Sequence, residues 1–229
     1  MVYNFAAGGQ GSVHLVETDD GRTLVLKEIL RNKMNNEDIA NLKKEHEIVK
    51  DCKHVNIVQF IDYHERLPVS QNHGLFFEHV RSGCDVNGGS FADYMDAYPL
   101  LGNATERNTR RKKRLEVCYQ ILKVTDFLHG KGIAHCDIKP DNILVERTHE
   151  DLRNEDQKDE DRLIAKLTDF GLATRSEKKY DKLGSLLHIA PEVWLMDAKK
   201  REEKGCGCKR CGCNTKAAEE KGCGCNTKA

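Results

Sequence analysis

Two short apolar runs in the second half of the chain, residues 143–145 and 164–167, constrain the fold more than any other feature. Each has the length of a strand rather than a helix, and each adjoins polar residues that can carry chemistry. The segment His135-Cys-Asp-Ile-Lys-Pro-Asp-Asn142 precedes the first run, and Thr168-Asp-Phe-Gly171 follows the second. Residues 146–162 between them are almost wholly charged, which is typical of an exposed excursion. The sequence therefore predicts two paired strands joined by a long surface segment.

The chain before residue 80 is predicted to be mostly sheet with one helix. Aliphatic and β-branched residues at 11–17 and 22–30 flank an Asp-Asp-Gly turn, which predicts a β-hairpin. Apolar residues recur at helical spacing among charges over 36–52, where Asn36 can begin a helix. Two further strands are expected at 56–61 and 74–78.

Helices dominate after a Gly-rich polar linker at 83–89. Ser90 can cap a short helix over 91–98, and residues 106–130 form a long amphipathic stretch. Its first turns are strongly basic, and a solvated helix face accounts for that run without any ligand. The residues expected on its apolar face repeat at intervals of three or four: Leu115, Cys118, Tyr119, Leu122, Thr125, Leu128 and His129.

The charge balance and hydropathy of the chain argue against nucleic-acid binding and membrane insertion. Lys and Arg together number 37, as do Asp and Glu, so net charge favours neither nucleic acid nor a membrane surface. The sequence has no transmembrane segment, because no run of about 18 apolar residues is present. The first residues lack the basic and apolar regions of a signal peptide. We therefore expect a cytoplasmic or nuclear protein with reduced thiols.

A glycine-rich segment and a lysine complete the set of candidate functional residues. The glycines of Ala6-Ala-Gly-Gly-Gln-Gly-Ser-Val13 let backbone amides approach phosphates, although a Gly-rich turn without a ligand has the same composition. Lys27 stands in an apolar run, and a lysine there needs a partner. Glu45 on the following helix is the best candidate for pairing, since Glu47 faces about 200° round the helix from it. The alternative is a surface glutamate and a lysine whose charged head reaches solvent.

Taken in order, these motifs resemble those of a eukaryotic-type Ser/Thr protein kinase. Ala6–Val13 fits G-x-G-x-x-G-x-V with alanine at the first glycine. His135–Asn142 is similar to H-R-D-x-K-x-x-N with Cys136 in place of arginine. Thr168–Gly171 contains the D-F-G triplet, and Ala190-Pro-Glu192 matches A-P-E. The lysine two residues after the catalytic-loop aspartate resembles Ser/Thr rather than Tyr kinases.

This resemblance implies a bilobal α+β kinase fold, with ATP between a small β-rich N-lobe and a helical C-lobe and with Mg²⁺ as cofactor. Asp137 is then the catalytic residue that accepts or orients the proton of a Ser/Thr hydroxyl in a protein substrate. Lys139 is implied to stabilise charge on the transferring phosphoryl group. Asn142 and Asp169 are the implied metal ligands.

The remaining implied residues belong to the nucleotide site. Lys27, paired with Glu45, holds the α- and β-phosphates in this family. The segment Glu78-His-Val80 resembles the hinge whose backbone binds adenine, and Phe77 resembles the residue at the back of the pocket. The glycines that approach the phosphates are Gly8 and Gly11, and the residues that enclose the base are Val13, Val25 and Leu144. Each of these apolar residues can equally be explained as part of the hydrophobic core, and a core residue can also enclose the base.

The resemblance covers residues 3–196, with an N-lobe at about 3–80 and a partial C-lobe at about 90–196. The family continues with helices that carry a D-x-[WY]-x-x-G motif and an arginine that pairs with the glutamate of A-P-E. Neither motif is found after Glu192. We therefore expect an incomplete helical C-lobe.

Two substitutions within the motifs bear on regulation and substrate choice. In related kinases the arginine replaced by Cys136 pairs with a phosphorylated residue of the activation segment, so that mode of control is not expected here. Gly184-Ser-Leu-Leu-His188 stands where G-T-x-x-Y is usual. Ser185 retains the hydroxyl that contacts the catalytic Asp and Lys, and His188 is a less common residue.

Residues 197–229 form a low-complexity Cys-Gly tail that contains an internal repeat. The tail has almost no apolar residues, so it cannot build a packed core. Six of the ten cysteines lie here, and Cys-x-Cys pairs can place two thiolates on one Zn²⁺ or Cu(I). Metal binding, reversible lipidation of exposed thiols and a functionless repeat are the three alternatives.

The sequence thus predicts Mg²⁺-dependent transfer of the γ-phosphate of ATP to Ser/Thr hydroxyls of a protein. Two alternatives come from other classes. The first is a catalytically inactive, truncated kinase that binds nucleotide or a partner as a regulator. The second is a gene fragment with no stable fold.

Overall fold

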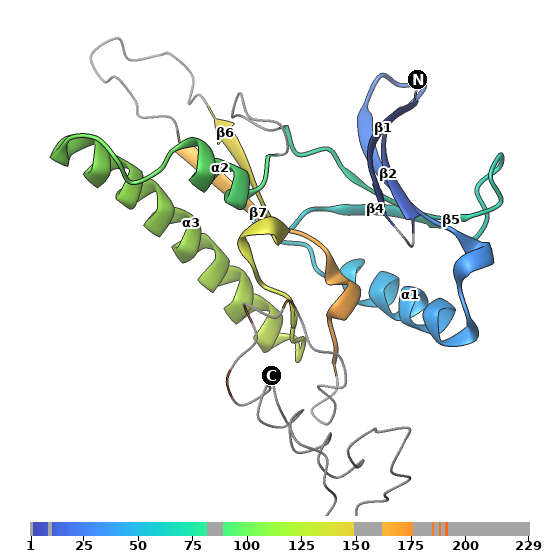
Figure 1. Ribbon diagram of the computed structural model, residues 1–229. Coiled ribbons are helices and arrows are strands. Elements are labelled where there is room, and N and C mark those ends of the chain that lie inside the picture. Colours follow the sequence, from blue (N-terminus) through green and yellow to red (C-terminus); the bar gives the residue numbers. More distant parts are fainter. Residues whose placement is uncertain are drawn as a thin grey trace, which may run out of the picture. The chain divides into compact units, whose positions relative to one another are not determined.

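The computed structural model describes residues 2–8, 11–81, 89–148 and 162–175, together with Ser185, His188 and Pro191. The chain divides into two compact units, Met1–Glu177 and Lys178–Ala229. The first unit contains all the helices and strands described below (Figure 1). Nearly all of the second unit, including the Cys-Gly tail, lies outside the described residues.

A five-stranded antiparallel sheet forms the N-terminal part, in the order β1-β2-β3-β5-β4. The predicted hairpin is confirmed as β2 and β3, and a further strand that the sequence analysis did not predict, β1, pairs with β2. The bounds of the strands are β1 Val2–Gly8, β2 Gly11–Glu17, β3 Thr23–Ile29, β4 Phe60–His64 and β5 His73–Glu78.

The register of the sheet puts one side chain of each central strand on the same face. Val13 lies opposite Lys27, and Lys27 lies opposite Leu75. Residues directly opposite each other in a sheet point to the same side, so these three side chains share a face. Leu75 is fully buried, whereas Lys27 is partly exposed. The lysine therefore extends from the edge of a buried apolar surface.

Helix α1, Asn36–Val49, begins with a capping box. The Asn35 side chain accepts a hydrogen bond from the Asp38 backbone, and the Asp38 side chain accepts one from the Asn35 backbone. This arrangement satisfies two backbone donors that would otherwise lack a partner. His46 of α1 stacks on Tyr63 of β4 with ring centroids 4.8 Å apart, so the helix packs against the sheet. Glu45 is thereby placed within reach of β3.

The strand predicted at 56–61 is wrong in its first half. Strand β4 begins only at Phe60, whereas Ile57 forms a parallel bridge with Leu167 at the end of strand β7, Arg162–Leu167. The Val58 amide donates to the Leu167 carbonyl at 2.9 Å, and the Leu167 amide donates to the Asn56 carbonyl at 2.8 Å. Local apolar pattern cannot distinguish these two partners. The segment links the large sheet to the small one.

Two helices and a pair of strands that are well separated in the sequence form the second part of the fold. Helix α2, Phe91–Ala97, starts at a Ser90 cap as predicted, and α3, Ala104–Gly130, starts at an Asn103 cap. Strands β6, Ile143–Thr148, and β7, Arg162–Leu167, pair as predicted. Helix α3 contacts β7, and α2 contacts β6. Short 3-10 turns complete the described elements: Arg31–Lys33, Pro140–Asn142 and Phe170–Leu172.

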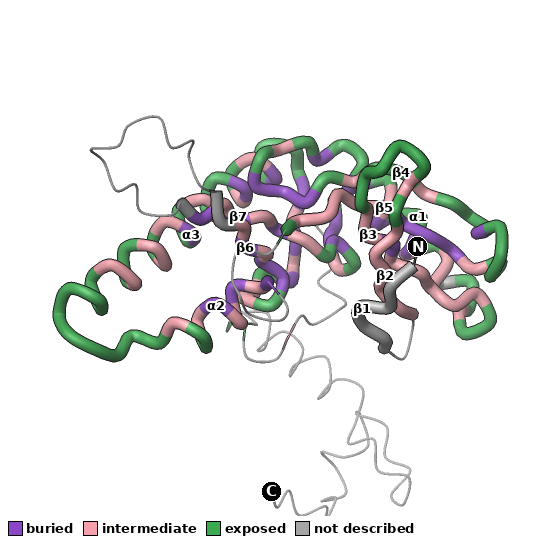
Figure 2. The backbone as a smooth tube through the Cα atoms, turned by 90° about the horizontal axis from the view of Figure 1, so that it is seen from above, coloured by how far each residue is buried: buried purple, intermediate pink, exposed green. Residues whose placement is uncertain are grey.

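The apolar face predicted for the long helix is wrong except at its C-terminal end, where Leu128 is buried. Leu115, Tyr119 and Leu122 have exposed fractions of 61%, 58% and 67%. The buried residues of α3 are Val117, Ile121, Val124 and Leu128, of which only Leu128 was predicted. The first half of this helix has only exposed and intermediate residues, and buried residues alternate with exposed ones from Val117 onward (Figure 2). Both sets repeat at three and four, so periodicity alone could not identify the buried one.

The hydrophobic core gathers around β7 and the buried face of α3. Leu167 and Val145 are fully buried, and Phe170 and Ile48 belong to the same cluster. This cluster therefore joins α1, the two small strands and the turn after β7. Among the described residues, no helix is both long enough and apolar enough to cross a membrane.

Candidate functional site

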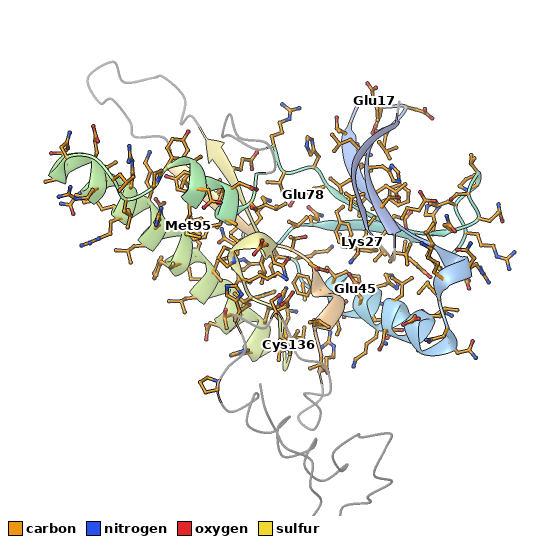
Figure 3. All side chains as sticks on the ribbon, viewed as in Figure 1. Glu17, Lys27, Glu45, Glu78, Met95 and Cys136 are labelled. Carbon is orange, nitrogen blue, oxygen red and sulfur yellow. The ribbon has the colours of Figure 1, made fainter. Side chains whose placement is uncertain are left out.

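The best-defined ion pairs of the site connect β3, α1 and the turn after β7. Lys27 Nζ lies 2.9 Å from Glu45 Oε1 and 3.2 Å from Asp169 Oδ1. Figure 3 shows Lys27 and Glu45 facing each other from their two elements. Glu45 is buried, so its charge needs this partner. The predicted pairing of Lys27 with Glu45 is thus present, and Asp169 joins it.

This environment keeps Lys27 protonated. Burial alone would lower the pKa of the ammonium, because it disfavours the charged form. The carboxylates of Glu45 and Asp169 act in the opposite sense and outweigh burial, so the Lys27 pKa is raised. A lysine held this way is a permanent cation beside Asp169, which suits an anionic ligand.

The catalytic-loop residues form a second cluster. Lys139 Nζ lies 2.9 Å from Asp137 Oδ2. The Asn142 side-chain amide donates to the same oxygen at 2.8 Å and to the Asp137 carbonyl at 2.9 Å. Asp137 and Asn142 are both buried, so the loop holds the carboxylate in one orientation. The structure therefore brings together Asp137, Lys139 and Asn142 as the sequence predicted.

His135 fixes the catalytic loop against the segment that carries Asp169. Its Nδ1 accepts from the Asp137 amide at 3.3 Å, so the neutral ring carries its proton on Nε2, which lies 3.1 Å from the Thr168 carbonyl oxygen. The ring also meets Phe170 edge to face, with centroids 4.8 Å apart. Burial is the main cause that lowers the His135 pKa. Sequence reasoning quoted this residue only as part of a motif and missed its structural role.

The two implied metal ligands also approach each other through the backbone. The Thr168 amide donates to the Asn142 carbonyl at 2.9 Å, and Asp169 follows directly with a left-handed φ of 60°. Aspartate tolerates that conformation better than most residues. Because the Asn142 amide nitrogen is engaged by Asp137, the side chain offers its carbonyl oxygen as a ligand. A carboxylate and an amide oxygen are the hard donors that Mg²⁺ prefers, so these residues fit the ion.

The glycine-rich segment has a structural reason for one of its glycines. A Cβ on Gly11 would overlap the Glu28 carbonyl oxygen and lie 3.2 Å from the Ile29 Cα. Gly11 is therefore required by the close approach of β2 to β3, whatever else it binds. The backbone of Gly8 ends β1, and the side chains of residues 2–8 are outside the description.

The residues implied to enclose a base are half-buried. Val13 and Val25 lie on the face of the sheet that carries Lys27, since Val25 faces Leu15 in the same register. Leu144 is half-buried in β6, and Val80 is half-buried after β5. The Glu78 side chain turns to Lys166, with Nζ and Oε1 2.7 Å apart. That ion pair was not predicted, because no local pattern links residues so far apart.

Cys136 occupies a left-handed position with φ 64°, and its thiol points to the Ala134 carbonyl at 3.6 Å. Burial raises the pKa of this thiol. Ala134 exchanges two backbone hydrogen bonds of 2.9 Å with Thr174. Lys44 Nζ lies 3.4 Å from the Thr174 hydroxyl. Thr174 is thus tied to the catalytic loop through backbone hydrogen bonds and to α1 through one lysine, and the next residue, Arg175, pairs with Asp51 just after α1 at 3.3 Å.

Several predicted features fall on residues that the structure does not describe. Glu192 of the A-P-E match and the whole Cys-Gly tail are among them. Ser185 and His188 are described, and the His188 amide donates to the Ser185 carbonyl at 2.7 Å. Within the described part of the chain, no group of three His, Cys, Asp or Glu side chains is placed to hold a metal. The proposed metal site of the tail therefore stays a prediction.

Comparison with known proteins identifies the family. The protein kinase domain matches residues 5–207. Serine/threonine-protein kinase RAD53 of Saccharomyces cerevisiae is 30% identical over 192 residues, which are 81% of this chain and 20% of that protein. Probable serine/threonine-protein kinase fhkA of Dictyostelium discoideum is 32% identical over 187 residues, which are 79% of this chain and 27% of that protein.

A human relative shows the same pattern. Serine/threonine-protein kinase ULK1 of Homo sapiens is 32% identical over 155 residues, which are 66% of this chain and 13% of that protein. The chain therefore spans less than a third of the length of these three relatives. The α+β arrangement of a β-rich N-terminal lobe followed by helices agrees with the family match. This chain belongs to the protein kinase family.

Proposed function

We propose that this chain is an ATP-dependent protein Ser/Thr kinase that transfers the γ-phosphate of ATP to a protein hydroxyl. The observation that carries the proposal is the meeting of two clusters. Lys27, Glu45 and Asp169 form one, and Asp137 with Lys139 and Asn142 forms the other. His135 and the bond from Thr168 to Asn142 join them.

When bound with Mg²⁺, ATP would supply the phosphoryl group that is transferred. Asp169 and Asn142 would hold the metal through their oxygens. Lys27 would bind phosphate oxygens with its ammonium, which the neighbouring carboxylates keep charged. Glu45 orients that lysine and remains paired to it. The protein thus contributes position and charge rather than covalent chemistry.

Asp137 is the residue that orients the acceptor hydroxyl in this proposal. The carboxylate is buried, and Lys139 and Asn142 both bind its Oδ2, which fixes its plane. Lys139 is placed beside it to stabilise the negative charge on the transferring group. The resemblance of this lysine to those of Ser/Thr kinases supports Ser and Thr as the acceptors.

The test is transfer of radiolabelled γ-phosphate from ATP with Mg²⁺ to a generic Ser/Thr protein substrate. Asp137→Ala is expected to lower kcat by at least about 100-fold, in line with the loss of a residue that acts on the transferred proton. Asp126→Ala, an exposed aspartate on α3, is the matched control and is expected to retain full activity.

The outcomes separate the alternatives. Full activity in Asp137→Ala contradicts the proposal. A wild-type chain that melts cooperatively and binds ATP without transferring phosphate supports the nucleotide-binding regulator instead. A chain without a cooperative melt supports the unstable fragment.

A further inference from the structure

The ion pair between the Lys166 and Glu78 side chains was not predicted by any kinase motif of the sequence, and it is among the shortest in the described residues. Lys166 Nζ is 2.7 Å from Glu78 Oε1, and the two side chains are 14% and 29% exposed. Glu78 ends β5, while Lys166 lies in β7, three residues before Asp169. The pair therefore connects the five-stranded sheet with the strand that leads to the proposed metal ligand.

The Glu78 carboxylate holds a third segment at the same point. The Gln59 amide donates to Glu78 Oε1 at 2.8 Å, and the Glu78 amide donates to the Gln59 carbonyl at 2.9 Å. The residues just before Gln59 pair in turn with β7, because Val58 and Asn56 exchange backbone hydrogen bonds with Leu167. Glu78 Oε1 thus accepts one hydrogen bond from a lysine of β7 and another from a backbone amide of the segment that pairs with β7.

These bonds span the two ends of the proposed nucleotide site. The backbone at Glu78 and Val80 is the segment implied to bind adenine, and Asp169 is the residue implied to bind the metal on the phosphates. A nucleotide touches both ends at once, so the spacing between them decides how well it fits. Effective binding by two linked contacts is lost when the geometry does not let both engage together.

We propose that Lys166 is a positioning residue for ATP: its bond to Glu78 fixes the spacing between the adenine-binding backbone and Asp169. This inference rests on the proposed kinase function. Lys166 itself touches no substrate, and its effect passes through Glu78. Charge-assisted hydrogen bonds to a carboxylate are stronger than neutral ones, which suits this bond to hold β5 and β7 at a fixed distance from each other.

The proposal predicts that loss of the Lys166 bond weakens the binding of a ligand that spans the site but not the binding of ligands that occupy one end. In Lys166→Met, the affinity for Mg²⁺-ATP is expected to fall roughly 10-fold, which corresponds to the loss of one such bond. Adenosine alone and Mg²⁺-tripolyphosphate alone are expected to bind within about 2-fold of wild type, because each contacts only one end. In turnover, KM for ATP is expected to rise more than kcat falls.

The experiment uses the full chain and titration calorimetry with these three ligands. Lys166→Arg preserves the cationic bond and is expected to restore ATP affinity. Lys123→Met, which removes a lysine lying over the Tyr119 ring on α3, is the matched control and is expected to bind ATP normally. If Lys166→Met does not fold, Glu78→Gln serves instead, since it removes the charge and keeps an oxygen for the Gln59 amide.

The following outcomes would overturn the inference about Lys166. Unchanged ATP affinity in a folded Lys166→Met, even with a lower melting temperature, overturns the inference and leaves the kinase function intact. Equal losses for adenosine and ATP also overturn it, because the pair would then shape only the adenine end. A wild-type chain that binds no ATP overturns both this inference and the proposed function.

Discussion

The two faces of α3 give the most direct test of the fold. Ile121 and Leu122 are consecutive residues of similar size on the same helix, but they are 7% and 67% exposed. Ile121→Ala removes a buried branched side chain and leaves a cavity, which costs about 2–5 kcal/mol of unfolding free energy. Leu122→Ala removes a side chain that is mostly in solvent, and surface changes of this kind stay within about 0.5 kcal/mol.

The expected difference between the two variants is therefore at least about 1.5 kcal/mol, a large share of a total stability of roughly 5–15 kcal/mol. Urea unfolding followed by circular dichroism measures it, with the slope of the transition expected to be the same in both. Equal destabilisation by the two variants would refute the reasoning, since it would mean that both faces of α3 are packed.

The remaining predictions concern the sheet and the catalytic loop. Gly11→Ala should destabilise the protein by about 1–3 kcal/mol, because its Cβ overlaps the backbone of β3. Gly130→Ala, whose Cβ meets nothing within 4 Å, should be neutral or stabilise by up to about 1 kcal/mol in the same thermal melts. A loss from Gly130→Ala equal to that from Gly11→Ala would contradict the steric argument. The lowered His135 pKa means that the unfolded chain binds more protons at this site, so stability should fall as pH drops below about 6.5. His135→Gln should lose stability less steeply over that range, and equally steep curves would show that other groups cause the effect.

The sequence was sufficient for the order of the elements after β1 and for the residues that meet in the two clusters of the candidate site. The aspartate, lysine and asparagine of the catalytic loop lie within six residues, so a local motif specifies their geometry. Lys27 was identifiable because a lysine in an apolar strand requires a partner, and the resemblance to the kinase family pointed to Glu45 on the helix that follows. These predictions depended on short-range patterns or on one strong electrostatic demand.

Contacts between surface-type residues far apart in the chain could not be predicted. Lys166 and Glu78 are ordinary charged residues in sequence, and only the pairing of β7 with the segment before β4 brings them together. The prediction of the buried face of α3 was wrong for a related reason. Its outer face carries leucine and tyrosine at the same spacing as the inner one, so the choice depends on where β7 lies.

The edges of the small sheet have a consequence for solubility. A two-stranded sheet normally presents unpaired backbone groups on both outer edges, where a strand from another molecule can add. On the β7 side, the Gln120 side chain accepts from the Ala165 amide at 2.9 Å and donates to the Leu163 carbonyl at 2.8 Å, which imitates a neighbouring strand. On the β6 side, the Gly89 carbonyl accepts from the Val145 amide at 2.8 Å. Backbone groups at the middle of each edge are thus paired from within the chain, which leaves fewer of them for a strand of another copy to bind.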